Sequence, residues 1–128
     1  ECAGAHGVII PKRRSVGLTA TVAKASAGAM EYMKVARVTN INNAISELKD
    51  KGVWIFGTAA EGSIPMYQAD LKGPAAIVIG NEGDGMSPLV RKNCDVTVHI
   101  PMEGKISSLN ASAAASILLY EAVRQRLG

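Results

Sequence analysis

Short apolar runs rich in β-branched residues alternate with segments of helical pattern along the chain, and this alternation limits the fold more than any other feature. We expect strands at residues 6–11, 35–39, 53–58, 75–80 and 96–101. Several of these runs lack polar alternation, as is typical of strands that helices cover on both faces. The chain is therefore predicted to have an α/β fold, with a mostly parallel sheet and helices on both faces of it.

Helices are expected between and after these strands, at residues 19–30, 40–52, 87–93 and 109–126. An asparagine begins the second helix and Gly52 ends it, and both are preferred cap residues. Ser87 and Pro88 suit the N-cap and the first helical position of the third. The last helix begins within the sequence SSLNAS, which holds more polar side chains than one cap needs.

Length and composition limit the class of protein. With 128 residues, 48% of them hydrophobic, the chain can bury one core and is too short for two ordinary domains. No apolar run approaches the roughly 18 residues that span a bilayer, and no signal-peptide pattern is present. Cys2 and Cys94 lie far apart, without the grouping of a disulfide framework or a zinc site. We expect one domain in the reducing cytoplasm, with no metal and no membrane partner.

Three loops at the carboxyl ends of strands have similar chemistry, and ligands of parallel α/β sheets bind in such loops. They read GTAAEGS, GNEGDGMS and PMEGKISS, and each contains one glutamate, at Glu61, Glu82 and Glu103. Glycines that only turn the chain and acids that are only solvated would explain any one of these loops. The three together favour a ligand crevice.

The middle loop brings several glycines close to one carboxylate, so that backbone can approach a ligand closely. It lacks the G-x-G-x-x-G spacing of dinucleotide-binding folds after a first strand, and it lacks the G-K-S/T of a P-loop. The predicted crevice is therefore of another kind.

Two long stretches, IVIGNEGDGMS and VHIPMEGKISSLNASAAASILLYEAVRQR, resemble the second and third motifs of the SpoU (TrmH) branch of the SPOUT RNA methyltransferases. The resemblance extends back through VWIFGTAAEG and AHGVIIPKRRS, and it is closest to the RlmB-type ribosomal RNA enzymes. It implies a deep trefoil knot at the C-terminal end of the fold, which general rules of topology do not propose. It also implies a homodimer, with the knot region and the last helix near the partner subunit.

The same resemblance implies that S-adenosylmethionine binds in the knot, held by backbone groups of three loops. The matching positions are Thr58, Ala59, Gly80, Ile100, Met102 and Leu109. The implied reaction transfers a methyl group to a ribose 2′-hydroxyl of RNA. A guanosine of ribosomal RNA is the expected target, and transfer RNA is the alternative.

Catalytic roles are implied for Glu82, Ser108 and Asn110. Glu82 matches a glutamate that holds a catalytic arginine, and the other two match residues that orient the ribose or the neighbouring loops. A ribose hydroxyl is a poor nucleophile unless its proton is pulled or its lone pair is oriented. Helix capping alone is the alternative for Ser108 and Asn110, because serine and asparagine are preferred N-caps.

The family's first motif, an asparagine and an arginine on a preceding strand and helix, has no counterpart in these residues. We therefore expect residues 1–128 to form a catalytic domain that lacks its first strand and the arginine credited with activating the hydroxyl. A non-catalytic module for RNA binding or dimerisation is the alternative, and an unrelated nucleotide-binding α/β protein is a third possibility.

Basic residues indicate where RNA phosphates would bind, in keeping with a modest net charge of +3. The candidates are Lys12, Arg13, Arg14 and Arg91. A solvated surface explains them equally well. His99, in an apolar strand, is interpreted as a structural histidine, and Trp54 as part of the core.

Overall fold

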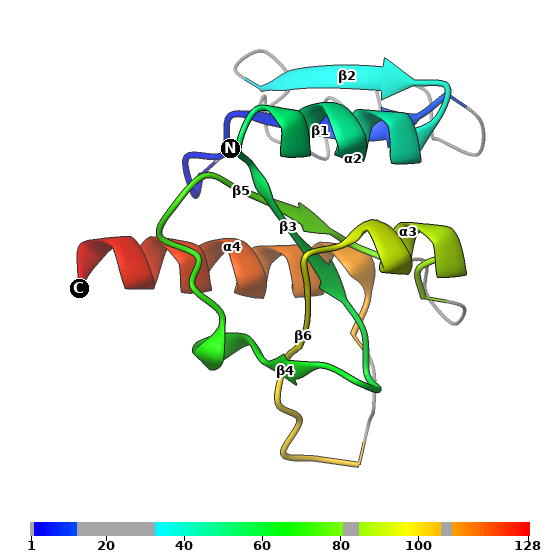
Figure 1. The fold of residues 1–128 in the computed structure, drawn as a ribbon. Coiled ribbons are helices and arrows are strands. Elements are labelled where there is room, and N and C mark those ends of the chain that lie inside the picture. Colours follow the sequence, from blue (N-terminus) through cyan, green and yellow to red (C-terminus); the bar gives the residue numbers. More distant parts are fainter. Residues whose placement is uncertain (1, 13–32, 81–84, 106–108) are drawn as a thin grey trace, which may run out of the picture. The chain divides into compact units, whose positions relative to one another are not determined.

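The computed structural model describes residues 2–12, 33–80, 85–105 and 109–128 (Figure 1). The chain divides into two compact units, Glu1–Ala44 and Ile45–Gly128, and each is described by itself. The helix predicted at residues 19–30 lies outside the described residues. No helix within the described ranges is long and apolar enough to cross a membrane. A single domain over residues 1–128 stays a prediction.

The first unit contains two parallel strands, β1 (Gly7–Pro11) and β2 (Lys34–Val38). They pair in register along their full lengths. The backbone N–H of Lys12 continues the ladder by donating to the carbonyl of Val38 at 2.8 Å. Both strands lie within one residue of their predicted positions.

Helix α2 (Ile41–Asp50) follows β2. Asn40 caps its start, because the side-chain oxygen Oδ1 accepts a hydrogen bond from the backbone N–H of Asn42 at 2.9 Å. Gly52 follows its end with a φ of 85°, in the left-handed region that glycine adopts without steric cost. The helix and both of its boundary residues agree with the sequence prediction.

The second unit is built on a four-stranded sheet (Figure 1). Its strands are β3 (Trp54–Thr58), β4 (Ile64–Pro65), β5 (Ala75–Val78) and β6 (Val96–His99). The order across the sheet is β4, β6, β3, β5, and every pair is parallel. Three of these strands lie within two residues of their predicted positions, whereas β4 and the 3₁₀ turn η2 (Met66–Gln68) are not predicted by the sequence.

One face of this sheet forms the core together with α4 (Ala111–Leu127). Phe56 of β3 and Val98 of β6 are buried there against Leu118 of the helix. The rest of the buried cluster comes from the chain after β4, at Met66, Ala69 and Leu71. Trp54 is 58% exposed at the start of β3, so its interpretation as a core residue is wrong.

The opposite face of the sheet lies against α3 (Pro88–Asn93) and the residues that flank it. Gly57 points to this face, where an added Cβ atom would lie 2.6 Å from Cys94 Sγ and 2.7 Å from the side chain of Met86. Ser87 caps α3, since its hydroxyl oxygen accepts from the backbone N–H of Val90 at 3.3 Å. Helices therefore cover both faces of this sheet, as the apolar strands indicate.

Hydrogen bonds attach the last turns of α4 to the chain that precedes β5. Gln125 donates through Nε2 to the carbonyl of Ala69 at 2.9 Å and accepts through Oε1 from the N–H of Leu71 at 2.8 Å. Arg126 donates to the carbonyls of Leu71 and Gly73 at 3.2 and 2.9 Å. These bonds fix the helix against the sheet from one end.

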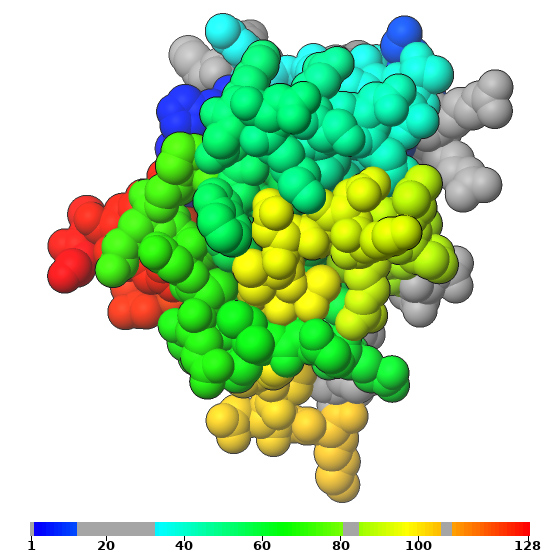
Figure 2. All heavy atoms as spheres, in the orientation of Figure 1, coloured from blue at the N-terminus to red at the C-terminus, as the bar shows by residue number. Residues whose placement is uncertain are grey.

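Strand β6 lies between β3 and β4, although only residues 59–63 join those two strands. Val98 of β6 is opposite Thr58 on one side and Ile64 on the other. Residues 59–63, which we call the bridge segment, therefore pass from one side of β6 to the other, about 10 Å at the usual strand spacing. Figure 2 shows this part of the chain, in green, on the same side of the molecule as α3, in yellow-green.

Candidate functional site

The carboxyl ends of β6, β3 and β5 are neighbours in the sheet, so the loops that follow them share one edge. Thr58, the last residue of β3, joins two of these ends. Its hydroxyl donates to the carbonyl of Val78 at 3.1 Å and accepts from the backbone N–H of Gly80 at 3.3 Å. The hydroxyl of Thr58 is thus engaged in hydrogen bonds within the protein. A ligand at this position would contact the backbone of Thr58.

Gly80 has no room for a side chain. An added Cβ atom would lie between 2.6 and 2.9 Å from the backbone atoms of Gly85 and Met86. The chain on the far side of residues 81–84 therefore packs directly against Gly80. Only glycine permits this close approach, so Gly80 itself has only backbone groups to offer a ligand.

The backbone of Ala59 is held on both sides. Its N–H donates to the carbonyl of Val98 at 3.0 Å, and its carbonyl accepts from the hydroxyl of Ser63 at 2.7 Å. Because both groups are bonded, the position of this residue at the edge of the sheet is fixed.

The loop after β6 brings apolar side chains to the same edge. Ile100 is half-buried and packs against the core cluster. Met102 and Leu109 are 41% and 38% exposed, one on each side of the stretch that lies outside the described residues. Exposed apolar side chains beside bonded backbone groups suit a flat, partly apolar ligand.

Asn110 is the N-cap of α4. Its Oδ1 accepts from the backbone N–H of Ala113 at 2.8 Å, which confirms the capping interpretation. Its side-chain nitrogen Nδ2 carries two hydrogens and bonds no residue in the described part of the chain. The side chain is therefore able to cap the helix and to donate to a ligand at the same time.

Four predicted site residues lie outside the described residues, namely Glu82, Ser108, Arg13 and Arg14. Their roles stay predictions. The structure does bring together Gly80 and Gly85, the described residues on either side of residues 81–84.

Two residues predicted to contact RNA are described. Lys12 is exposed after β1 in the first unit. Arg91 is exposed on α3, and its guanidinium donates to the backbone carbonyl of Glu61 in the bridge segment. An RNA contact for either residue stays a prediction. The bond from Arg91 to Glu61 also gives Arg91 a structural role, since it attaches α3 to the bridge segment.

Cys94 follows α3 beneath the sheet. Burial raises the pKa of its thiol, and the neighbouring carboxylate of Asp95 raises it further. Its Sγ donates to the carbonyl of Val90 at 3.3 Å. A raised pKa keeps the thiol protonated near neutral pH, so Cys94 fits a packing role and not that of a nucleophile.

Sequence reasoning missed a group of polar contacts on the bridge segment. Ser63 contacts Nδ1 of His99 at 2.9 Å, and the hydroxyl of Thr97 donates to the carbonyl of Gly62 at 3.1 Å. The alternation in the sequence VTVH places Thr97 and His99 on the same face of β6, which is the only signal for them in the sequence. His99 is a bonded structural histidine, as interpreted, yet its partner lies in a predicted ligand loop.

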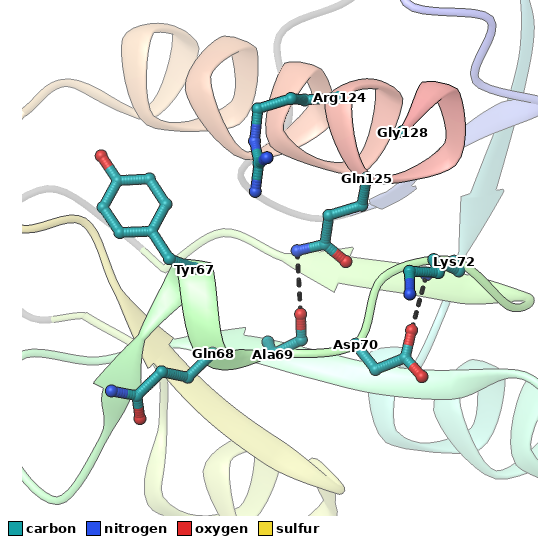
Figure 3. A pocket seen from close by; sticks show the side chains of 8 residues that line it. All are labelled: Tyr67, Gln68, Ala69, Asp70, Lys72, Arg124, Gln125 and Gly128. Atoms are coloured by element: carbon teal, nitrogen blue, oxygen red, sulfur yellow. Dashed lines mark hydrogen bonds between the residues drawn. The ribbon is translucent and has the colours of Figure 1, made fainter.

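Two cavities of the second unit lie away from this edge. One, of about 460 Å³, is lined by the end of α4 and the chain around η2, including Tyr67, Arg124 and Gln125 (Figure 3). The other, of about 200 Å³, lies at the start of β3 between Trp54 and Asp95. Of the predicted site residues that the structure describes, none lines either cavity.

Residues 1–120 match the model of a protein family described as the SpoU rRNA Methylase family. The putative TrmH family tRNA/rRNA methyltransferase YacO of Bacillus subtilis is 52% identical over 126 residues, which cover 98% of this chain and 51% of that protein. The 23S rRNA (guanosine-2′-O-)-methyltransferase RlmB of Shewanella oneidensis is 53% identical, with the same shares covered. The chain thus spans about half the length of the curated relatives it matches.

Solved structures show the same fold. The SpoU methyltransferase AviRb from Streptomyces viridochromogenes, in complex with the cofactor AdoMet, superposes with a TM-score of 0.89 at 34% sequence identity. The match covers 98% of this chain and 52% of that one. An α/β fold with parallel strands is therefore common to both chains.

Proposed function

Because the chain belongs to the SpoU rRNA methylase family, we propose that it is the catalytic part of an S-adenosylmethionine-dependent RNA methyltransferase. The proposed acceptor is a ribose 2′-hydroxyl, and the proposed target is a guanosine of ribosomal RNA, in keeping with the name of the Shewanella relative. Transfer RNA is the alternative target, since the Bacillus relative is named for both RNAs. The family match over residues 1–120 is the observation that carries the proposal.

The edge formed by the three loops suits S-adenosylmethionine. Gly80 leaves no room for a side chain, and the carbonyl of Ala59 keeps a second lone pair beside its bond to Ser63, so both positions would offer main-chain groups to an adenine. Ile100, Met102 and Leu109 would supply apolar contact. When bound, the cofactor supplies a methyl group activated on a sulfonium sulfur.

The chain's own residues would position the acceptor. A ribose hydroxyl reacts only when its oxygen is held in line with the methyl group and its lone pair is oriented. The Nδ2 group of Asn110 can donate hydrogen bonds to the ribose while Oδ1 caps α4. The resemblance assigns Ser108 and Glu82 to the same edge, and the arginine that the matching glutamate holds in the family has no counterpart in residues 1–128.

We propose the trefoil knot on the strength of the strand order. A strand late in the chain, β6, lies between two earlier strands that only the bridge segment joins. Such an insertion beneath a short link is what a knotted chain needs, and ordinary α/β sheets seldom contain one.

The proposed partners follow from the same family. RNA would meet the basic positions Lys12, Arg13, Arg14 and Arg91, and a second copy of the chain would complete a homodimer through the knot region and α4. We propose that the enzyme acts in the cytoplasm and without a metal ion.

The first test is calorimetric titration of the purified chain with S-adenosylmethionine and S-adenosylhomocysteine, with ATP and NAD as controls. We expect both sulfur ligands to bind and neither control to compete. Incubation with ribosomal RNA and radiolabelled S-adenosylmethionine, followed by mapping of 2′-O-methylation, then tests the reaction. Cofactor binding without transfer to any RNA would support the non-catalytic module, and a folded chain that binds neither sulfur ligand would contradict the proposal.

A further inference from the structure

We propose that Ser63 and His99 form a positioning pair that fixes the bridge segment, and with it the backbone of Ala59, for cofactor binding. The inference rests on the proposed function. It concerns two residues to which neither the resemblance nor the relatives' names assign a role. Both lie in the second unit, half-buried beside the edge where the three loops meet.

The distances, together with the chemistry of the carbonyl group, favour one assignment of the hydrogens. The hydroxyl of Ser63 lies 2.7 Å from the carbonyl oxygen of Ala59 and 2.9 Å from Nδ1 of His99. The carbonyl oxygen of Ala60 also lies 3.2 Å away. A carbonyl oxygen can only accept, so the single hydrogen of the hydroxyl points to these two carbonyls, of which Ala59 is the nearer. Nδ1 of His99 must then carry a hydrogen and donate to the Ser63 oxygen, because two lone pairs facing each other at this distance would repel. The neutral ring is therefore the Nδ1–H tautomer.

Two more contacts hold the neighbouring residues of the bridge segment. The hydroxyl of Thr97 donates to the carbonyl of Gly62 at 3.1 Å, and the guanidinium of Arg91 donates to the carbonyl of Glu61. Three successive residues of the bridge segment are thus each bonded by one side chain from α3 or β6. The side chains from β6 share one face of the strand, while Val98 faces the core.

The need for such bonds follows from the composition of the bridge segment. Residues 60–62 are exposed, and Gly62 has a φ of 65°. An exposed segment with a glycine and no buried apolar side chain has little to keep it in one conformation. A ligand that binds its backbone would have to order it first, and bonds made beforehand lower that cost. Among the three contacts, only the pair of Ser63 and His99 reaches the carbonyl of Ala59 itself.

The test compares three variants by calorimetric titration with S-adenosylhomocysteine. One hydrogen bond contributes about 0.5–1.5 kcal/mol, so we expect Ser63→Ala and His99→Leu each to raise Kd about 3- to 10-fold. His99→Asn keeps an N–H donor near the position of Nδ1 and should restore most of the affinity. Rescue by asparagine but not by leucine separates the hydrogen bond from the packing of the ring.

Ser116→Ala is the matched control. Its hydroxyl also donates to a carbonyl four residues earlier, that of Ser112 at 2.8 Å, but on the exposed surface of α4. We expect this variant to bind S-adenosylhomocysteine as the wild type does. An equal loss of affinity in Ser116→Ala and Ser63→Ala would overturn the proposal.

Nitrogen-15 NMR of the His99 ring gives a readout that does not depend on the ligand. We expect the Nδ1–H tautomer in the wild type and a shift toward the Nε2–H tautomer in Ser63→Ala. An Nε2–H tautomer in the wild type would overturn the pair itself. Failure of the wild type to bind either sulfur ligand would instead remove the proposed function, with the tautomer unchanged, so the two failures are distinguishable.

Discussion

The side chain of Asn110 has an acceptor, Oδ1, that caps α4, and a donor, Nδ2, that is available to a ligand. A single substitution can remove the donor and keep the acceptor. Aspartate caps helices as well as asparagine does, so Asn110→Asp should keep the bond to the N–H of Ala113 and the stability of the fold. Its carboxylate cannot donate, so we expect the rate of methyl transfer to fall by an order of magnitude or more. Asn110→Ala should lose transfer and, in addition, about 1 kcal/mol of unfolding free energy.

Urea unfolding and single-turnover methyl transfer on the same preparations check both expectations. Full transfer activity in Asn110→Asp would show that capping is the whole role of this residue.

A substitution at Gly80 tests whether the close approach of two backbone stretches is needed for cofactor binding. The Cβ atom of Gly80→Ala would lie 2.6 Å from the backbone of Gly85, so the loop must move. Overpacking of this kind costs about 1–3 kcal/mol, and we expect the affinity for S-adenosylhomocysteine to fall with it. Gly73→Ala is the control, because among the described residues no atom beyond its chain neighbours lies within 4 Å of the added Cβ. Similar affinities for the two variants, measured by calorimetry, would contradict a role for the crowding at Gly80.

At the scale of elements, α4 depends on one glutamine. Gln125 uses both hydrogens and its oxygen, because Nε2 donates to Ala69 and Glu121 while Oε1 accepts from Leu71. Gln125→Leu would remove these bonds from the buried residues Ala69, Leu71 and Glu121, and we expect a loss of about 1–3 kcal/mol in urea unfolding. Gln68→Leu, at an exposed glutamine, should change stability by less than about 0.5 kcal/mol. A loss of the same size in both variants would point to helix or turn propensity in place of the bonds.

Glu121 makes the stability of α4 depend on pH. Hydrogen bonds from Arg124 lower the pKa of the Glu121 carboxyl, and this outweighs burial, which raises it. A lowered pKa in the folded state means that the stabilisation is present above the ordinary carboxyl pKa and is lost as pH falls through the lowered value.

We therefore expect Glu121→Gln to cost about 1 kcal/mol at pH 7, a value kept small because Arg124 is 65% exposed. The difference from the wild type should shrink as pH falls below the ordinary carboxyl pKa of 4.5 toward the lowered pKa of Glu121. Urea titrations at several pH values measure it, and a difference that stays constant with pH would show that the charge of Glu121 does not contribute.

Some elements can be predicted from the sequence and others cannot. The difference is whether the signal lies within one segment or depends on pairing with a distant one. β5 and β6 follow from β-branched runs and α2 from its caps, all of which are signals within one segment. β4 has two residues and exists because β6 pairs with it, so no local pattern predicts it. The site divides in the same way. Asn110 and Gly80 stand in local motifs, whereas Ser63 and His99 are 36 positions apart and only the sheet brings them together.

At the scale of the whole molecule, the proposed homodimer has a testable surface. Ile117 and Tyr120 are exposed three residues apart on α4, and they are 36% and 52% exposed. We expect the chain to sediment as a dimer and Tyr120→Glu to shift it toward the monomer. Leu89→Glu, at an exposed apolar residue of α3, is the matched control and should leave the dimer intact. A wild type that sediments as a monomer at all concentrations would contradict the proposed assembly.

The position of β6 between β3 and β4 also has a consequence for the order in which the strands pair during folding. During synthesis β3, the bridge segment and β4 leave the ribosome seconds before β6 does, at the usual rate of about 5–20 residues per second. If β3 and β4 paired directly in that interval, the position between them would be closed. A direct β3–β4 pair would have to open again before the later strand could enter. Folding of this chain should accordingly be slow for its size, with insertion of β6 as the rate-limiting step.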